Sequence, residues 1–328
     1  MNKYILYQFE YLINNFINKY SINSILLAIS GGQDSICLIK LMNSLKKKLC
    51  RKNNFRISYI YIDHQWKKDS KKQIKHLINY IQSINEKIEI YQINKIIISE
   101  NECRKYRYNI IFQHAIKYQY KLILTAHSNT DKIETFLQNI IRGCGIEGLT
   151  SLTIKSKFHN KQYILRPLNN IKRETVYWIC KKFCLPIWSD STNYIYKIQR
   201  NRIRQELLPY IKKYFHTNIE NNIEKLLQNY YYDNEYIKQN TIKLYIKNTH
   251  NINIAINYKK IIKQNFALQS RTIQLFCFHN FQIYLDNNKI IKITEIIKNN
   301  ALNSKIIMEH KNFSFHLNKN WIYLKLKI

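Results

Sequence analysis

The sequence contains very little glycine or proline. Its 328 residues include five glycines and three prolines, and all five glycines lie in two short segments, 31–32 and 143–148. The chain is rich in Ile, Asn, Lys and Tyr, as an AT-rich genome would produce. If such a bias removes glycine wherever it is dispensable, the remaining glycines mark positions that need unusual backbone geometry. We therefore expect two functional loops.

Cysteine pairs with metal-binding spacing are also missing. The seven cysteines are odd in number and irregularly spaced, and no C-x-x-C pair occurs. This pattern argues against a disulfide scaffold and against a zinc or iron–sulfur knuckle. We expect a protein of a reducing compartment.

Acidic residues and long apolar runs are scarce as well. There are 53 Lys and Arg residues against 21 Asp and Glu, for a formal net charge of +32. Such a charge favours a polyanionic partner, with nucleic acid ahead of a membrane surface, although AT-rich codons contribute some of the lysine. No apolar run is long enough to span a bilayer, so no membrane partner is expected. The first residues lack the features of a signal peptide or a transit peptide, so we expect the protein to function in the compartment where it is translated. That compartment is a plastid (chloroplast) stroma if the gene is encoded in the organelle, and the cytoplasm otherwise.

Strand and helix patterns alternate along the first two thirds of the chain. This order predicts an α/β fold with a doubly wound, mostly parallel sheet. The predicted strands are 26–29, 55–64, 87–95, 120–127 and 162–168, and the predicted helices are 36–42, 70–84, 100–119, 131–143 and 172–183. A smaller, mainly helical C-terminal domain ending in short strands is expected at 215–328, after a catalytic domain at 1–214.

Polar segments follow three of the predicted strands. They are Ser30–Ser35, Asp63–His64 and Thr125–Asp131. Ligands of doubly wound folds bind at the carboxyl ends of the strands, so these segments are expected along one rim. The first, "SGGQDS", stands between a strand and a helix, where backbone N–H groups and the helix dipole favour an anion. It is neither a Walker A loop nor a G-x-G-x-x-G loop.

This loop resembles the S-G-G-x-D-S pyrophosphate loop of the N-type ATP pyrophosphatases, whose fold is adenine nucleotide alpha-hydrolase-like. The segment "TAHSNTDKIETFLQNIIRGCGIEGL" (125–149) is similar to the signature of the tRNA(Ile)-lysidine synthases, T-A-H-H-x-D-D-Q-x-E-T followed by R-G-x-G-x-x-G-L. The motifs "RKYRY" (104–108), "RPL" (166–168), "DSTN" (190–193) and "RNRIR" (200–204) keep that family's order. The resemblance covers roughly 22–210. Ser128, Thr130 and Lys132 depart from the pattern, and Thr130 replaces one of two family carboxylates.

The resemblance implies a two-step reaction with ATP and Mg²⁺. ATP adenylates C2 of the cytidine at the first anticodon position of a tRNA(Ile) with anticodon CAU, and the amine of L-lysine then displaces AMP to give lysidine. The modified tRNA reads AUA in place of AUG and is charged with isoleucine in place of methionine. The expected partners are this tRNA and lysine, and the oligomeric state is left open, with a homodimer among the alternatives.

The resemblance also implies roles for individual residues. Ser30, Gly31, Gly32, Gln33 and Ser35 are expected to bind the phosphates of ATP. Asp34 is expected to hold Mg²⁺, with Asp131 as a second metal ligand or as the group that activates the lysine amine. His127 and Arg107 are the candidates for stabilising charge on the α-phosphate. The candidate contacts to tRNA or lysine are Arg104, Glu134, Arg142, Arg200 and Arg204. The cytidine must leave its stack, so an aromatic or arginine platform is expected nearby.

Each of these residues has a structural alternative. His127 is also explained as a strand-end histidine bonded to the backbone, Asp131 as a helix cap, and Glu134 as the partner of a neighbouring lysine. The pairs 104/107 and 200/204 are also explained as solvated basic helix faces. For the whole chain, the alternatives are a tRNA 2-thiolase, a decayed ATP-gated tRNA-binding protein and a small-molecule adenylating ligase. Thiolation commonly uses paired cysteines, and Cys144 has no evident partner.

Overall fold

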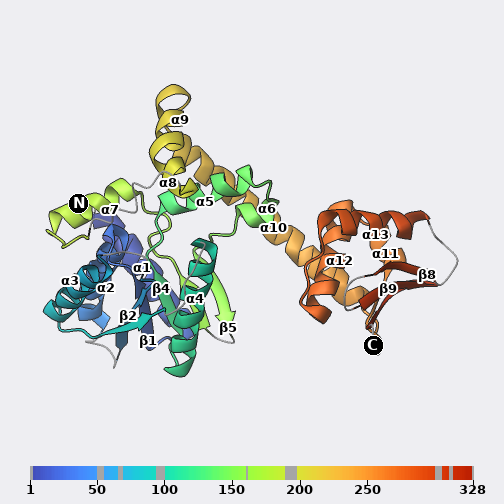
Figure 1. Cartoon of the computed structure of the whole chain (residues 1–328), viewed down its shortest axis with the longest axis horizontal. Helices are drawn as coiled ribbons and strands as arrows, with labels where there is room; N and C mark the ends of the chain where they lie inside the picture. Colours follow the sequence, from blue (N-terminus) through green and yellow to red (C-terminus); the bar gives the residue numbers. More distant parts are fainter. Residues whose placement is uncertain are drawn as a thin grey trace. The chain divides into compact units, whose positions relative to one another are not determined.

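The structure, a computed structural model, describes residues 3–49, 55–65, 69–93, 100–159, 162–188, 198–299, 305–309 and 313–326. The chain divides into two compact units, 1–225 and 226–328, so the division falls inside helix α10 (Ile219–Asn248). The sequence placed the domain boundary at 214/215. The two units are described separately below, and Figure 1 labels many of the elements of both.

The N-terminal unit is built around a six-stranded sheet of strand order β3-β2-β1-β4-β6-β5. The strands are β1 (Ser24–Ile29), β2 (Arg56–Asp63), β3 (Ile88–Gln92), β4 (Leu122–Thr125), β5 (Lys155–His159) and β6 (Gln162–Leu165). All neighbours pair in parallel except β5, which forms an antiparallel edge with β6. The predicted mostly parallel, doubly wound sheet is therefore confirmed. The edge strand β5 was not predicted, and the predicted strand 162–168 ends at Leu165.

Helices cover both faces of this sheet. The helices of this unit are α1 (Lys3–Tyr20), α2 (Gln33–Leu49), α3 (Ser70–Ser83), α4 (Glu100–Lys117), α5 (Asn129–Ile141), α6 (Ile146–Leu149), α7 (Arg173–Lys182), α8 (Gln199–Arg202), the π-helix η2 (Ile203–Leu207) and α9 (Leu208–Tyr214). Adjacent residues of β1 point to opposite faces, since Leu27 packs in a core with α1, α2, α3 and α7, whereas Leu26 packs in a second core with α4. Burial on both faces explains why β1 and β4 are almost uninterrupted apolar runs.

The strand order places a topological switch point between β1 and β4. The chain runs from β1 to β2 and β3 on one side of the sheet and then returns to β4 on the other side of β1. In open sheets of this kind, a crevice forms outside the carboxyl ends of the two strands that flank the switch. The loop after β1 and the segment after β4 therefore both border this crevice.

The C-terminal unit combines helices with a second sheet. After α10 come β7 (Ala255–Asn257), α11 (Tyr258–Ile262), α12 (Phe266–Phe281), α13 (Asn287–Asn299), β8 (Lys305–Glu309), β9 (Phe313–Asn318) and β10 (Trp321–Leu326). The sheet is antiparallel with strand order β7-β10-β9-β8, and it shares an apolar core with α11, α12 and α13. The predicted helical region with terminal strands is present, and β7 is an additional strand that the sequence did not reveal.

Candidate active site

The loop after β1 turns sharply between strand and helix. Gly31 has a φ of +76°, which disfavours any residue with a Cβ, and an added Cβ there would approach Gln73 Nε2 to 3.3 Å. The Ser35 hydroxyl accepts a hydrogen bond from the Ser30 backbone N–H at 3.0 Å and lies 2.9 Å from the Ser30 hydroxyl. These contacts close the loop over the first turn of α2. The predicted strand–loop–helix arrangement is present.

Two contacts hold the carbonyl groups of this loop from outside. Gln73 Nε2, on α3, donates to the Ser30 carbonyl at 2.9 Å, and the Trp188 N–H donates to the Gly31 carbonyl at 3.4 Å. Gln73 is buried although its side chain is polar. Tying down the carbonyls restricts the loop to one conformation, which suits a backbone that must present its N–H groups to an anion. No sequence pattern marks Gln73, which lies in an ordinary amphipathic helix.

Asp34 lies in the first turn of α2, at the crevice. Its Oδ1 atom is buried and has no hydrogen-bond partner. Burial raises the pKa of Asp34 to about 6, and the nearby charge of Asp131 adds to the effect, whereas Arg173 and Arg204 oppose it. A buried carboxylate oxygen without a partner is a costly arrangement that a bound cation would relieve. Asp34 therefore fits the role of a Mg²⁺ ligand.

The segment after β4 carries His127. Its Nδ1 atom lies 3.0 Å from the Thr125 hydroxyl. Burial lowers the pKa of His127 to about 3; Asp131 works against this effect, and Arg166, Arg107 and Arg104 reinforce it. The imidazole is consequently neutral at physiological pH. It can donate one N–H to a phosphate oxygen, but it does not contribute the positive charge that stabilisation by an imidazolium would require.

Asp131 has a structural role at the start of α5. The helix begins at Asn129 rather than at the predicted 131, with Ser128 as the N-cap. The Asp131 carboxylate accepts a hydrogen bond from the Ser128 N–H at 2.8 Å and lies 3.2 Å from the Ser128 hydroxyl. This is the reciprocal contact of a capping box, so Asp131 contributes to capping from the third helical position, not from the cap itself. Ser128, a departure from the family pattern, thus contacts Asp131 through both its N–H and its hydroxyl.

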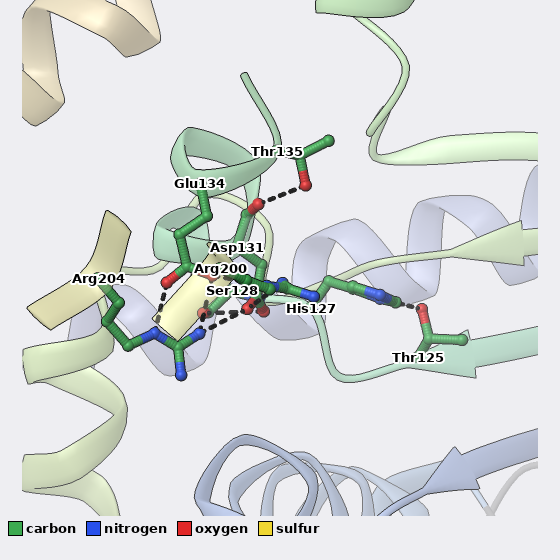
Figure 2. A network of polar contacts seen from close by, with 8 residues as sticks. All are labelled: Thr125, His127, Ser128, Asp131, Glu134, Thr135, Arg200 and Arg204. Atoms are coloured by element: carbon green, nitrogen blue, oxygen red, sulfur yellow. Dashed lines mark hydrogen bonds and ion pairs between the residues drawn. The ribbon is translucent and has the colours of Figure 1, made fainter. Parts of the chain in front are cut away.

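Figure 2 shows Asp131 and Glu134 on α5 facing two arginines that follow far later in the chain. Arg200 donates to Asp131 Oδ1 and to Glu134 Oε2, both at 2.7 Å. Arg204 donates to Asp131 Oδ1 at 3.2 Å, to Glu134 Oε2 at 2.9 Å, and through Nε to Glu134 Oε1. We call these four residues the carboxylate–arginine cluster.

The charges of the cluster offset one another. Burial favours a raised pKa for Asp131, but Arg200, His127, the Ser128 N–H and Arg204 outweigh it, so the pKa of Asp131 lies below its usual value. Glu134 is fully buried. Arg200 and Arg204 thus do not form the solvated basic face considered as an alternative, and Glu134 pairs with arginines rather than with a lysine. That Arg200, Arg204 and Glu134 contact a substrate stays a prediction.

Helix α4 brings two more predicted arginines towards the cluster. Burial lowers the pKa of Arg107; Tyr108 opposes this effect, and the neighbouring charges of Arg104 and Arg200 increase it. Both Arg104 and Arg107 also act on the pKa of His127. The two arginines therefore lie near the crevice, on the side of β4. Arg166, from the "RPL" motif, joins them, with Nη1 bonded to the Thr153 carbonyl and the Ser156 hydroxyl, both at 2.9 Å.

The second glycine segment follows α5. The N–H of Gly143 donates to the Ile140 carbonyl and that of Cys144 to the Asn139 carbonyl, which is a Schellman motif with Gly143 at a φ of +70°. At Gly148, an added Cβ would lie 2.8 Å from the Cys144 Cβ. Two of the three glycines of this segment thus have reasons within the fold. Arg142, at the end of α5, is exposed. The predicted motif at 190–193 lies outside the described residues.

Comparison with known proteins is consistent with this geometry. A family model described as PP-loop domain matches residues 5–211. The tRNA(Ile)-lysidine synthase of the chloroplast of Gracilaria tenuistipitata var. liui is 46% identical to this chain, over 98% of the chain and 99% of that protein. The chain belongs to the tRNA(Ile)-lysidine synthase family of PP-loop proteins. A second family member, from the chloroplast of Pyropia yezoensis, is 32% identical over 98% of both sequences.

Solved structures add a likeness of fold. A U34-tRNA thiolase from Methanococcus maripaludis, solved with its [4Fe-4S] cluster, matches 62% of this chain and 72% of its own with a TM-score of 0.51. The sequence identity is 17%, so this likeness shows the PP-loop fold alone. For the lysidine synthase family member described here, the shared fold places the "SGGQDS" loop at the switch point of the sheet.

Proposed function

We propose that this chain is a ligase that uses ATP to attach lysine to C2 of the cytidine at the first anticodon position of a tRNA(Ile) with anticodon CAU. The reaction passes through an adenylated tRNA, releases diphosphate and AMP, and gives lysidine. It changes the tRNA from methionine to isoleucine specificity. The relatives favour this reaction over the 2-thiolation considered from the sequence.

One observation carries the proposal. The "SGGQDS" loop, with Asp34 at the start of α2, borders the same crevice as His127 and the carboxylate–arginine cluster after β4. A loop that presents backbone N–H groups at a helix N-terminus suits the phosphates of ATP. The PP-loop domain is an ATP-binding domain, so the chain uses ATP. Arginines and a neutral histidine beside this loop suit the charge that develops when a phosphate bond breaks.

Mg²⁺ is part of the proposal, and the donor set fits it. Mg²⁺ prefers carboxylate oxygens and commonly takes one or two of them together with substrate phosphates and water. Asp34 offers the unpartnered oxygen, and Asp131 is close enough to raise its pKa. Bound there, the ion would neutralise phosphate charge. Within the described residues no group of three or more His, Cys, Asp or Glu side chains forms a metal site, and Mg²⁺ does not need one.

Individual residues of the chain have different roles in the proposed reaction. Ser30, Ser35 and the loop N–H groups hold the phosphates, and His127 donates an N–H to a phosphate oxygen while staying neutral. Arg107, with Arg104 beside it, faces the negative charge that develops on the α-phosphate. None of these groups transfers a proton. The amine of lysine must lose one before or during its attack, and Asp131 is the proposed acceptor if Arg200 and Arg204 release it.

Binding of lysine by Glu134 is a more demanding proposal. Both carboxylate oxygens of Glu134 already accept hydrogen bonds from Arg200 or Arg204. The ammonium group of lysine would have to displace one arginine before it could pair with Glu134. Until then, Glu134 holds the two arginines in place, since a buried carboxylate requires compensating charge.

The further proposals concern the C-terminal unit and the compartment. We assign tRNA binding to 215–328, where tyrosines stand among lysines along α10. The chloroplastic relatives support the proposal that the protein functions in a plastid stroma. In the described part of the chain, no helix is both long and apolar enough to span a bilayer. A homodimer stays a prediction.

The test measures AMP release and labelled lysine in tRNA, with ATP, Mg²⁺, lysine and an unmodified CAU-anticodon tRNA(Ile) transcript. We expect both signals in the wild type and neither in Asp34→Asn or Asp131→Asn, with Glu89→Gln, at an exposed site on strand β3, as the control. Lysine incorporation would also show that Thr130 is compatible with activity. Tight tRNA binding without AMP or label would refute the proposal in favour of the decayed, binding-only alternative.

A further inference from the structure

Three aromatic side chains are exposed together on and just after helix α9. Tyr210, Tyr214 and Phe215 are 53%, 61% and 74% exposed. The ring centroids of Tyr210 and Tyr214 lie 4.8 Å apart, and those of Tyr210 and Phe215 lie 6.0 Å apart. Single exposed aromatic residues are common, but here Tyr210 lies beside both other rings, so the three form one apolar surface. We call these three residues the aromatic platform.

Basic residues lie along the helical run that carries the platform. Segment 199–220 contains five Arg and Lys residues and two acidic residues. Arg202 pairs with Glu206, Lys212 pairs with Glu220, and Arg200 and Arg204 pair with the carboxylates of the cluster, so Lys213 is the cation that acts on the platform directly. Lys213 Nζ lies 4.9 Å from the centroid of the Tyr214 ring. Aromatic faces beside lysines bind single-stranded nucleic acid, because bases stack on the rings while cations contact the phosphates.

The platform is connected directly to the candidate active site. Helices α8, η2 and α9 follow one another without a break from Gln199 to Tyr214, and Arg204 of the carboxylate–arginine cluster lies within this run. Arg204 and Tyr214 are ten residues apart, which corresponds to about 15 Å along a helix. That length matches about four stacked nucleotides at 3.4 Å each. In Figure 1, α9 stands clear of the central sheet.

We propose that the aromatic platform is a stacking site for unpaired nucleotides of the RNA substrate, a few nucleotides from the base that reacts. The inference rests on the proposed function, because it names how the same substrate is held. It assigns this part of RNA recognition to the N-terminal unit, in residues that precede α10. Stacking of neighbouring unpaired nucleotides there would hold the loop open while the cytidine leaves its stack.

The experiment compares two matched double variants of the full-length chain. Tyr210→Ala/Tyr214→Ala removes two of the three rings of the platform, including Tyr210, which lies beside both others. Tyr7→Ala/Tyr11→Ala removes an equally exposed pair on α1, where the rings are 65% and 58% exposed with centroids 6.1 Å apart. Dissociation constants are measured for a labelled stem-loop RNA with a CAU loop and for a blunt RNA duplex of equal length. Thermal unfolding of each variant verifies that it folds.

We expect the platform variant to bind the stem-loop about tenfold more weakly or worse, because each stacked base contributes on the order of 1–3 kcal/mol. Duplex binding, the KM for ATP and binding by the α1 variant should stay at wild-type values. The variant Tyr210→Phe/Tyr214→Phe keeps the rings and should restore stem-loop binding.

Three results would overturn the inference. The first is an unchanged stem-loop dissociation constant in the platform variant. The second is an equal loss for stem-loop and duplex, which would indicate a charge effect without stacking. The third is a change in oligomeric state by light scattering, which would assign the surface to a protein partner. Failure of the proposed function is distinguishable, since it would appear as missing lysine incorporation in the wild type, whatever the binding ratios.

Discussion

The carboxylate–arginine cluster allows a stability prediction from the structure. Glu134 is fully buried and accepts three hydrogen bonds from the guanidinium groups of Arg200 and Arg204. In Glu134→Gln the side-chain shape is retained, but the amide nitrogen cannot accept a hydrogen bond. At least one guanidinium N–H then loses its acceptor, and the two arginines keep only one of their two compensating carboxylates, that of Asp131.

Breaking a fully buried ion pair costs about 3–5 kcal/mol. The two arginines are 24% and 21% exposed, so water compensates part of the loss, and the lower end of that range, about 3 kcal/mol, is the expected decrease in unfolding free energy. For a unit of this size, that corresponds to a decrease in Tm of about 6–12 °C. Calorimetry of the full-length chain at neutral pH measures it.

The matched control is Glu206→Gln. Glu206 pairs with Arg202 at 3.1 Å on the same helical run, but the two side chains are 49% and 63% exposed. An exposed i, i+4 pair contributes less than about 0.5 kcal/mol, so its Tm should change by no more than about 2 °C. Equal Tm changes in the two variants would refute the argument that burial of Glu134 determines the cost.

Further expected outcomes concern the crevice and its loops. Burial raises the pKa of Asp34 to about 6, so the carboxyl group binds a proton more tightly in the folded protein than in the unfolded chain. The free energy of unfolding should therefore decrease between about pH 4 and pH 6 and stay reduced above pH 6. Asp34→Asn should therefore raise Tm at pH 7 while it abolishes AMP release, and a lowered Tm would contradict this. In Gly148→Ala the new Cβ would lie 2.8 Å from the Cys144 Cβ, so the free energy of unfolding should fall by about 1–3 kcal/mol and Tm should fall with it. In Gly145→Ala the new Cβ meets nothing within 4 Å, and Tm should stay unchanged. Gln73→Leu should raise the KM for ATP in AMP-release assays and leave the KM for tRNA unchanged, since it releases only the loop carbonyl; equal changes in both constants would indicate general unfolding.

The parallel sheet could be predicted because its central strands are buried on both faces. The apolar runs of β1 and β4 and the glycine pair after β1 are local features, visible without partners. Strand β5, "KSKFH", alternates between exposed and half-buried residues at the edge of the sheet, so it has no apolar run to reveal it. Its position depends on pairing with β6, which is a non-local interaction.

The site was only partly predictable for the same reason. The candidates Asp131, Glu134, Arg200 and Arg204 were all identified, but not as partners of one another. The spacing of Arg200 and Arg204 shows that they share a helix face, whereas the identity of what that face contacts depends on α5, more than sixty residues earlier in the chain. The neutral state of His127 likewise depends on burial and on three surrounding arginines, which no local pattern encodes.

The glycines fall into two groups, those that the fold itself requires and those that it does not. Gly31 and Gly143 are required by a positive φ, and Gly148 by the space that Cys144 occupies. At Gly32 and Gly145 the protein itself would accept a methyl group, because an added Cβ would meet only the Ser30 hydroxyl at 3.8 Å or nothing at all. A side chain at these two positions would therefore leave the fold intact and occupy space outside it. Any activity lost in Gly32→Ala or Gly145→Ala would measure how closely a substrate comes to the backbone there.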